Sequence, residues 1–167
     1  MMQRYLPKIW LLMVLGLLAV LVWSQFVLPD VAATTFGFQN EVTGTMAKDA
    51  FLIFYLVLGT SINLLFFAIF KSEPDGLIIR ISNLPRKEYW LQPERVARGI
   101  GKLRIMIAGV AVTVNLIWFL SVVFLIYVNT GHSSFSSGQF VLVCFVLVGA
   151  LIAWCFHIAQ DEAASQS

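Results

Sequence analysis

Long apolar runs separated by short polar segments dominate the pattern of this chain. Four runs contain no Asp, Glu, Lys or Arg, and they cover residues 9–29, 50–70, 105–128 and 140–159. As a helix rising about 1.5 Å per residue, a run of about 20 residues spans a hydrocarbon core of about 30 Å. The pattern therefore predicts an all-α membrane protein with four transmembrane helices.

The basic residues lie almost entirely on one side of those spans. Ten of the eleven Lys and Arg residues precede the first run or lie within 71–104, and only Lys48 falls on the other side. Cytoplasmic loops of membrane proteins carry such an excess. We therefore expect both termini in the cytoplasm, with loops 30–49 and 129–139 outside the membrane.

The composition leaves no room for a separate soluble domain. Of 167 residues, 59% are hydrophobic, so we expect one integral membrane domain covering 1–167. The net charge of +2 comes from the cytoplasmic side and suits anionic lipid headgroups, which makes the lipid bilayer a partner and nucleic acid an improbable one. The first run is longer than the 7–15 residues of a typical signal-peptide core, so we expect it to stay as an anchor.

The outer segment 30–49 mixes Thr, Gly, Gln and Asn with aromatic residues, as recognition loops do. We expect it to lie on the membrane surface or to re-enter the bilayer. It is the longest external segment, and the spans hold no charged site that would compete with it. Our candidate binding residues are therefore Phe36, Phe38, Gln39, Asn40 and Glu41.

The central segment 71–104 places cations beside two aromatic residues that favour the membrane interface. The group comprises Arg86, Lys87, Tyr89, Trp90 and Arg95. This composition predicts a segment lying on the cytoplasmic membrane surface. Pro93 suits the first turn of a helix, so a helix is expected from about residue 93 straight into the third span.

Polar residues inside the spans are neutral, which argues against an ion pump or a proton-coupled transporter. Asn63 and Asn115 fall at similar depth in the inner halves of two spans. We expect a hydrogen bond between them that holds the helices together. His132 and His157 have no further ligand at metal-binding spacing, and no nucleophile has a base nearby. We therefore expect no metal, no cofactor, no catalytic residue and no enzymatic activity.

Two stretches resemble a known family, the SdpI-type immunity proteins and related bacterial membrane proteins of unknown function. One lies within 28–52, and the other, NLPRKEYWLQPER at 83–95, resembles the N-x-P-x-x-x-Y-W-L-x-P-E-R stretch of some members. Where the family usually shows His-Phe-Asn, this chain has Thr35-Phe36-Gly37, so only the Phe matches. The resemblance implies a multi-pass protein of the bacterial inner membrane, in the best-known case one that protects against a secreted toxin and signals its presence.

Together these features favour a protein that acts by binding, in an immunity, sensing or accessory role, with a membrane protein or peptide as partner. One alternative is a small transporter or channel for a neutral or lipid-like solute. Such a path would be lined by Thr60, Asn63, Asn115 and Ser121. Another alternative is a structural subunit of a larger membrane complex.

Overall fold

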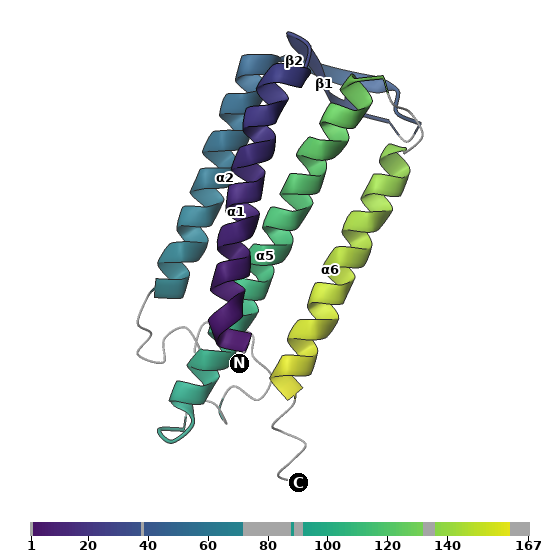
Figure 1. Cartoon of the computed structure of the whole chain (residues 1–167). Coiled ribbons are helices and arrows are strands. Elements are labelled where there is room, and N and C mark those ends of the chain that lie inside the picture. Colours follow the sequence, from purple (N-terminus) through teal and green to yellow (C-terminus); the bar gives the residue numbers. More distant parts are fainter. Residues whose placement is uncertain (1, 38, 72–87, 89–91, 132–135, 161–167) are drawn as a thin grey trace.

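A computed structural model describes residues 2–37, 39–71, 88, 92–131 and 136–160. These residues form four long helices and one β-hairpin (Figure 1). In chain order the elements are α1 (Met2–Val27), β1 (Val31–Phe36), β2 (Val42–Ala47), α2 (Lys48–Lys71), α5 (Val96–Asn129) and α6 (Ser137–Gln160).

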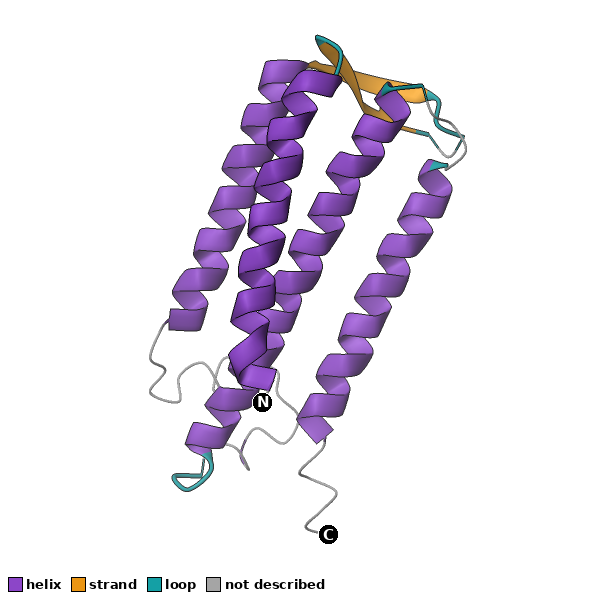
Figure 2. Cartoon of the chain, viewed as in Figure 1, coloured by secondary structure: helices purple, strands orange, loops and turns teal. Residues whose placement is uncertain are grey.

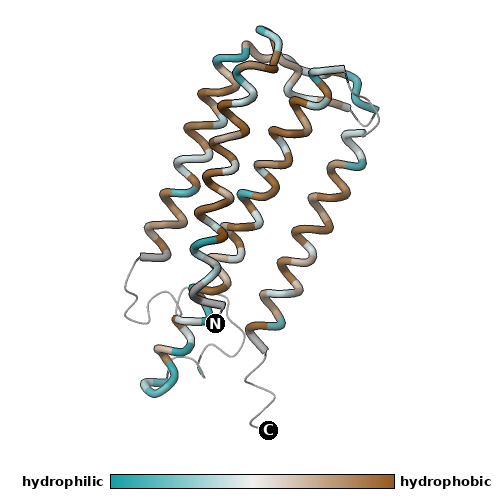
Figure 3. Tube along the Cα trace, in the orientation of Figure 1, coloured by the Kyte–Doolittle hydropathy of each residue, from teal (hydrophilic) through white to brown (hydrophobic). Residues whose placement is uncertain are grey.

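Each of the four helices is long and apolar enough to cross a membrane. The qualifying segments are Pro7–Val27, Lys48–Ile69, Val96–Asn129 and Ser137–Ile158. Hydrophobic positions follow the helices along their middles, whereas hydrophilic positions gather at their ends and in the connections (Figure 3). The predicted architecture of a multi-pass, four-helix membrane protein is therefore confirmed.

The two ends of the bundle hold different parts of the chain. The hairpin, the end of α5 and the start of α6 share one end, and the starts of α1 and α5 lie near the other (Figure 1). We call these the hairpin end and the basic end. Loops 30–49 and 129–139 thus leave the bundle on the same side, as an arrangement of four spans requires. The charge distribution predicts that the basic end faces the cytoplasm.

The core lies between α1 and α5. Leu17, Val20, Leu21 and Ser24 repeat at helical spacing on α1 and are all buried. On α5 the buried positions Ala108, Ala111, Asn115 and Val122 form the facing stripe. Because lipid tails are as apolar as Leu, close packing rather than the hydrophobic effect holds helices together in a bilayer. Small residues such as Ala108 and Ala111 permit that close approach.

Helices α2 and α6 lie at the periphery of this core. Only 6% of each candidate span is buried, compared with 28% for α1 and 39% for α5. Gly109 of α5 and Trp154 of α6 make one close contact, in which a Cβ atom on Gly109 would overlap the indole ring. At the basic end, the Lys102 ammonium donates a hydrogen bond of 3.0 Å to the carbonyl of Ile158, which suits the negative end of α6.

The structure makes two expectations about local structure more specific. Between α1 and α2, strands β1 and β2 form a hairpin that lies across the bundle end, and the described residues of this segment do not re-enter between the helices (Figure 2). Helix α5 begins at Val96, within one turn of the expected start at about residue 93, and the Gln92 carbonyl accepts hydrogen bonds from the N–H groups of Arg95 and Val96 in the turn before it. From there α5 runs unbroken for 34 residues, so its first turns extend the bundle at the basic end (Figure 1).

Candidate functional site at the hairpin end

The hairpin connects α1 to α2, and hydrogen bonds close it at its base. Strands β1 and β2 pair antiparallel, with Val31 opposite Ala47 and Phe36 opposite Val42. At its base, the Lys48 N–H donates a hydrogen bond of 2.8 Å to the Asp30 carbonyl. The Lys48 ammonium also lies 3.3 Å from the Asp30 carboxylate. The Asp30 carboxylate is fully exposed, so its ion pair with Lys48 contributes little to stability. The backbone hydrogen bond therefore holds the base of the hairpin more firmly.

Strand β1 is fastened to the bundle through Asn129, the last residue of α5. The Asn129 Oδ1 accepts a hydrogen bond of 2.8 Å from the Ala33 N–H, and its Nδ2 donates one of 2.9 Å to the Ala33 carbonyl. Nδ2 also donates to the Leu125 carbonyl at 2.8 Å, which orients the side chain. The neighbouring Ala32 is buried in the core cluster with Val122 and Leu125. An amide side chain thus pairs with β1 much as a neighbouring strand would.

The hairpin tip is joined to the start of α6. Asn40 has a φ of 65°, in the left-handed region that Asn tolerates, and its Oδ1 accepts a hydrogen bond of 2.6 Å from the Ser137 N–H. This satisfies one of the N–H groups left open at a helix start. The Ser137 hydroxyl donates in turn to the Gly37 carbonyl. The tip therefore bridges β1 and α6 across a gap of about a hundred residues in sequence.

Aromatic rings continue this junction below the tip. Phe36 meets Phe124 edge to face with 5.8 Å between ring centroids, and Phe124 stacks on Phe140 at 4.8 Å. A cavity of about 230 Å³ lies beside them, and its wall includes the polar residues Thr34, Tyr55, Ser121 and Ser137. The Ser121 hydroxyl donates to the carbonyl of Ile117 on its own helix, so it is already engaged.

The five candidate binding residues fall into different environments. Phe36 and Asn40 contact the helices, as described above, and are half-buried. Gln39 and Glu41 are exposed, and the Glu41 Oε2 accepts a hydrogen bond of 2.9 Å from the Gln39 N–H within the turn. Phe38 lies outside the described residues. The exposed part of the hairpin is mainly strand β2, which our reading of the sequence did not identify.

A signal for these strands is visible in the sequence. VAATTF and VTGTMA are rich in β-branched residues, and they are joined by a short segment containing Gly, Gln and Asn. Such a pair of runs is typical of a hairpin. The contact from Asn129 carries no comparable signal, because Ala33 lies 96 positions away.

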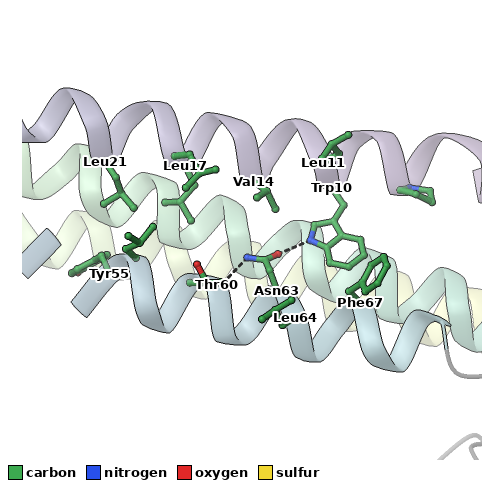
Figure 4. A pocket seen from close by; sticks show the side chains of 14 residues that line it. Trp10, Leu11, Val14, Leu17, Leu21, Tyr55, Thr60, Asn63, Leu64 and Phe67 are labelled. Atoms are coloured by element: carbon green, nitrogen blue, oxygen red, sulfur yellow. Dashed lines mark hydrogen bonds between the residues drawn. The ribbon is translucent and has the colours of Figure 1, made fainter. Parts of the chain in front are cut away.

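The amides expected to pair inside the bundle do meet. Asn63 and Asn115 exchange two hydrogen bonds of 2.9 Å, each donating its Nδ2 to the other's Oδ1 (Figure 4 shows Asn63). The remaining amide hydrogens go to the carbonyls of Gly59 and Ala111 on the respective helices. The Trp10 indole N–H donates to the Asn63 Oδ1 at 2.7 Å.

This network joins α1, α2 and α5 and uses every N–H of the two amides and the indole. Asn115 is only 2% exposed. Interhelical hydrogen bonds of this kind contribute about 0.5–2 kcal/mol each in membranes. Because no amide hydrogen is left for a solute, the arrangement is suited to holding helices together.

Of the five residues expected to lie at the cytoplasmic membrane surface, the structure describes only one. Arg86, Lys87, Tyr89 and Trp90 lie outside the described residues, so their expected position on the membrane surface stays a prediction. Arg95 lies at the N-terminal cap of α5. Among the described residues, no three His, Cys, Asp or Glu side chains gather as a metal site would require.

Comparisons with known proteins found no family model, no curated protein and no solved structure that matches this chain. The resemblance to the SdpI-type proteins accordingly depends on the two sequence stretches alone. The first of them contains the hairpin, and most of the second lies outside the described residues.

Proposed function

We propose that this chain is a bacterial inner-membrane protein that acts by binding a protein or peptide partner at its hairpin end, without catalysing a reaction. One observation carries the proposal: β1 is fastened to the bundle, whereas β2 keeps an exposed surface. Because β1 holds β2 in place, the exposed face of β2 is preorganised for a partner, which lowers the entropy cost of association.

Strand β2 has the features of an edge open to pairing. Val42, Thr43, Thr45 and Met46 are exposed, and among the described residues β1 is the only strand beside it. Exposed edge strands recognise extended peptides by adding a strand, with backbone hydrogen bonds supplying affinity. Strand β2 contains no charged residue, so the proposed partner segment is extended and neutral or apolar.

An immunity or sensing role fits this surface. A toxin or signal that arrives from outside would meet the hairpin end first, if the basic end faces the cytoplasm as the charges predict. The resemblance to SdpI-type proteins supports the same assignment. The hairpin, rather than the His-Phe-Asn triplet that the chain lacks, would then provide the recognition.

A transporter for a neutral solute has less support. Thr60 and Asn63 line a groove between α1 and α2, Ser121 lines the cavity beneath the hairpin, and Asn115 is buried between helices. Neither of these two cavities in the described part of the chain brings all four polar residues together. A structural subunit would instead bind its partners through the apolar faces of α2 and α6, which gives the two binding hypotheses different contact surfaces.

Photocrosslinking in living cells tests the proposal. A benzoylphenylalanine introduced at Thr43 or Thr45 should form a discrete adduct with another protein, and the same residue at Leu142 on α6 should not. Val42→Lys should reduce that adduct because edge lysines block strand addition. Val31→Lys is the matched control, since Val31 and Val42 are 61% and 55% exposed but lie on different strands.

Two outcomes would contradict the proposal. Adducts from Leu142 but not from β2 would favour the structural subunit. If no position on the hairpin or on α6 gives a protein adduct while the protein remains abundant in the membrane, binding of a protein partner is wrong.

A further inference from the structure

An elongated apolar groove runs between α1 and α2 (Figure 4). It extends from Pro7 to Leu21 on α1 and from Tyr55 to Phe67 on α2, with a volume of about 620 Å³. On each helix the lining residues recur every three or four positions, so they lie on one face of that helix. The groove begins at the basic end of the bundle and lies almost wholly within the two candidate spans.

The wall of the groove is largely apolar, and its polar side chains are those of Trp10, Tyr55, Thr60 and Asn63. The Trp10 indole donates to the Asn63 amide (Figure 4), and the Asn63 amide N–H groups donate to Asn115 and Gly59. Most of the remaining lining is Leu, Val and aromatic carbon, as at Leu11, Val14 and Leu64. An occupant must therefore be largely hydrocarbon.

The length of the groove suits an extended hydrocarbon chain. The 14-residue step from Pro7 to Leu21 corresponds to about 21 Å along the axis of α1. Residues of both helices, such as Leu11 and Val14 on α1 and Leu56 and Leu64 on α2, would contact a chain that lies along this length. The apolar wall and the elongated outline of the groove therefore suit a single acyl chain.

We propose that this groove binds one hydrocarbon chain of an anionic phospholipid from the cytoplasmic leaflet. The headgroup would lie at the Pro7 end, where Lys8 is exposed and where the first turns of α5 carry Arg98, Lys102 and Arg104. The groove is about 21 Å long, against about 15 Å for half of the hydrocarbon core, so it accommodates a chain through its whole leaflet. This lipid site is independent of the proposed partner site on β2.

The test uses the purified protein in vesicles of phosphatidylethanolamine and phosphatidylglycerol. A trace of phosphatidylglycerol with a diazirine in one acyl chain is photoactivated, and the labelled residues are mapped by mass spectrometry. We expect saturable labelling of Val14, Leu56 and Leu64, suppressed by excess unlabelled phosphatidylglycerol. Phosphatidylcholine with the same chains should compete more weakly, because it lacks the negative charge.

A matched pair of variants tests the site itself. Leu64→Trp fills the groove, whereas Leu65→Trp adds the same ring just outside it, and the two leucines are 62% and 60% exposed. Groove labelling should fall about tenfold in Leu64→Trp, because the indole ring displaces part of the acyl chain from the groove. Leu65→Trp should leave it unchanged. Leu18→Trp and Leu15→Trp form a second such pair on α1.

Several results would overturn the proposal. Labelling that is equal in the groove and on exposed Phe145 of α6, and that excess lipid does not suppress, would indicate ordinary bilayer contact only. Equal competition by phosphatidylcholine would contradict the headgroup assignment. The competition measurements use the unaltered protein, so they test the lipid site even if the Trp variants fail to fold. Because no partner is present, failure here leaves the proposed function untouched.

Discussion

The side chain of Asn129 pairs with both backbone polar groups of Ala33, accepting from the N–H at 2.8 Å and donating to the carbonyl at 2.9 Å. The end of a transmembrane helix thereby holds the first strand of the hairpin in place. Together with the hydrogen bond from Ser137 to Asn40, this contact ties the hairpin to both α5 and α6. The surface presented by β2 therefore depends on residues far from β2 in the sequence.

Replacing Asn129 by Ala should weaken the attachment of the hairpin to α5 while the four helices stay packed. Two backbone groups of Ala33 lose their partner, and because Ala33 is only half-buried each lost hydrogen bond should cost about 0.5–1.5 kcal/mol. Hydrogen exchange at the Ala33 amide should accelerate accordingly. Thr130→Ala is the control, because the Thr130 hydroxyl donates to carbonyls of its own helix, those of Ile126 and Tyr127. If the Ala33 amide is equally protected from exchange in Asn129→Ala, the hydrogen bonds from Asn129 are not needed to hold the hairpin.

The paired amides should contribute to stability as a coupled unit. A double-mutant cycle with Asn63→Ala and Asn115→Ala should give a coupling free energy of about 0.5–2 kcal/mol. Unfolding in bicelles by steric trapping measures it. Ser121→Ala, which removes a hydroxyl bonded within its own helix, should have a small effect. An abundant and stable double variant that has lost its cellular phenotype would instead favour a solute site between the helices.

Gly109 should be required for α6 to dock, whereas Gly149 should not. A methyl group on Gly109 would overlap the Trp154 ring, but nothing lies within 4 Å of the corresponding position on Gly149. Overpacking of this kind costs about 1–3 kcal/mol. Gly109→Ala should therefore lower the melting temperature, and Trp154→Leu should partly restore it. Gly149→Ala should be neutral, and a larger loss from Gly149→Ala than from Gly109→Ala would contradict this packing.

The basic end should face the cytoplasm. In a background in which Cys144 and Cys155 are replaced, a cysteine at Gln39 should react with an impermeant reagent in intact cells, and one at Glu94 should be protected. Both positions are exposed, so accessibility of the side chain does not confound the result. The opposite labelling pattern would invert the topology and remove the argument that the hairpin meets external partners.

The four spans could be predicted from the sequence because each one is a local property of composition and length. A run without charges that is long enough for the bilayer must form a helix, since its backbone groups have no water to bond. The pairing of Asn63 with Asn115 was also predictable, from their similar depth in the two spans. The start of α5 at Val96 lies within one turn of the position expected from Pro93, because Pro suits the first turn of a helix.

Tertiary structure alone decided which surfaces of these elements meet and which stay open. The sequence predicts that Phe36 and Asn40 bind a partner, which stays a prediction, whereas only the structure shows that their ring and amide also join the hairpin to α5 and α6. The groove between α1 and α2 likewise has no signature of its own, because its Leu and Val residues resemble every other lipid-facing position. Hydropathy determines that a residue lies in the membrane. In a solvent as apolar as the side chains themselves, only steric fit and a few hydrogen bonds determine whether it faces another helix or a lipid.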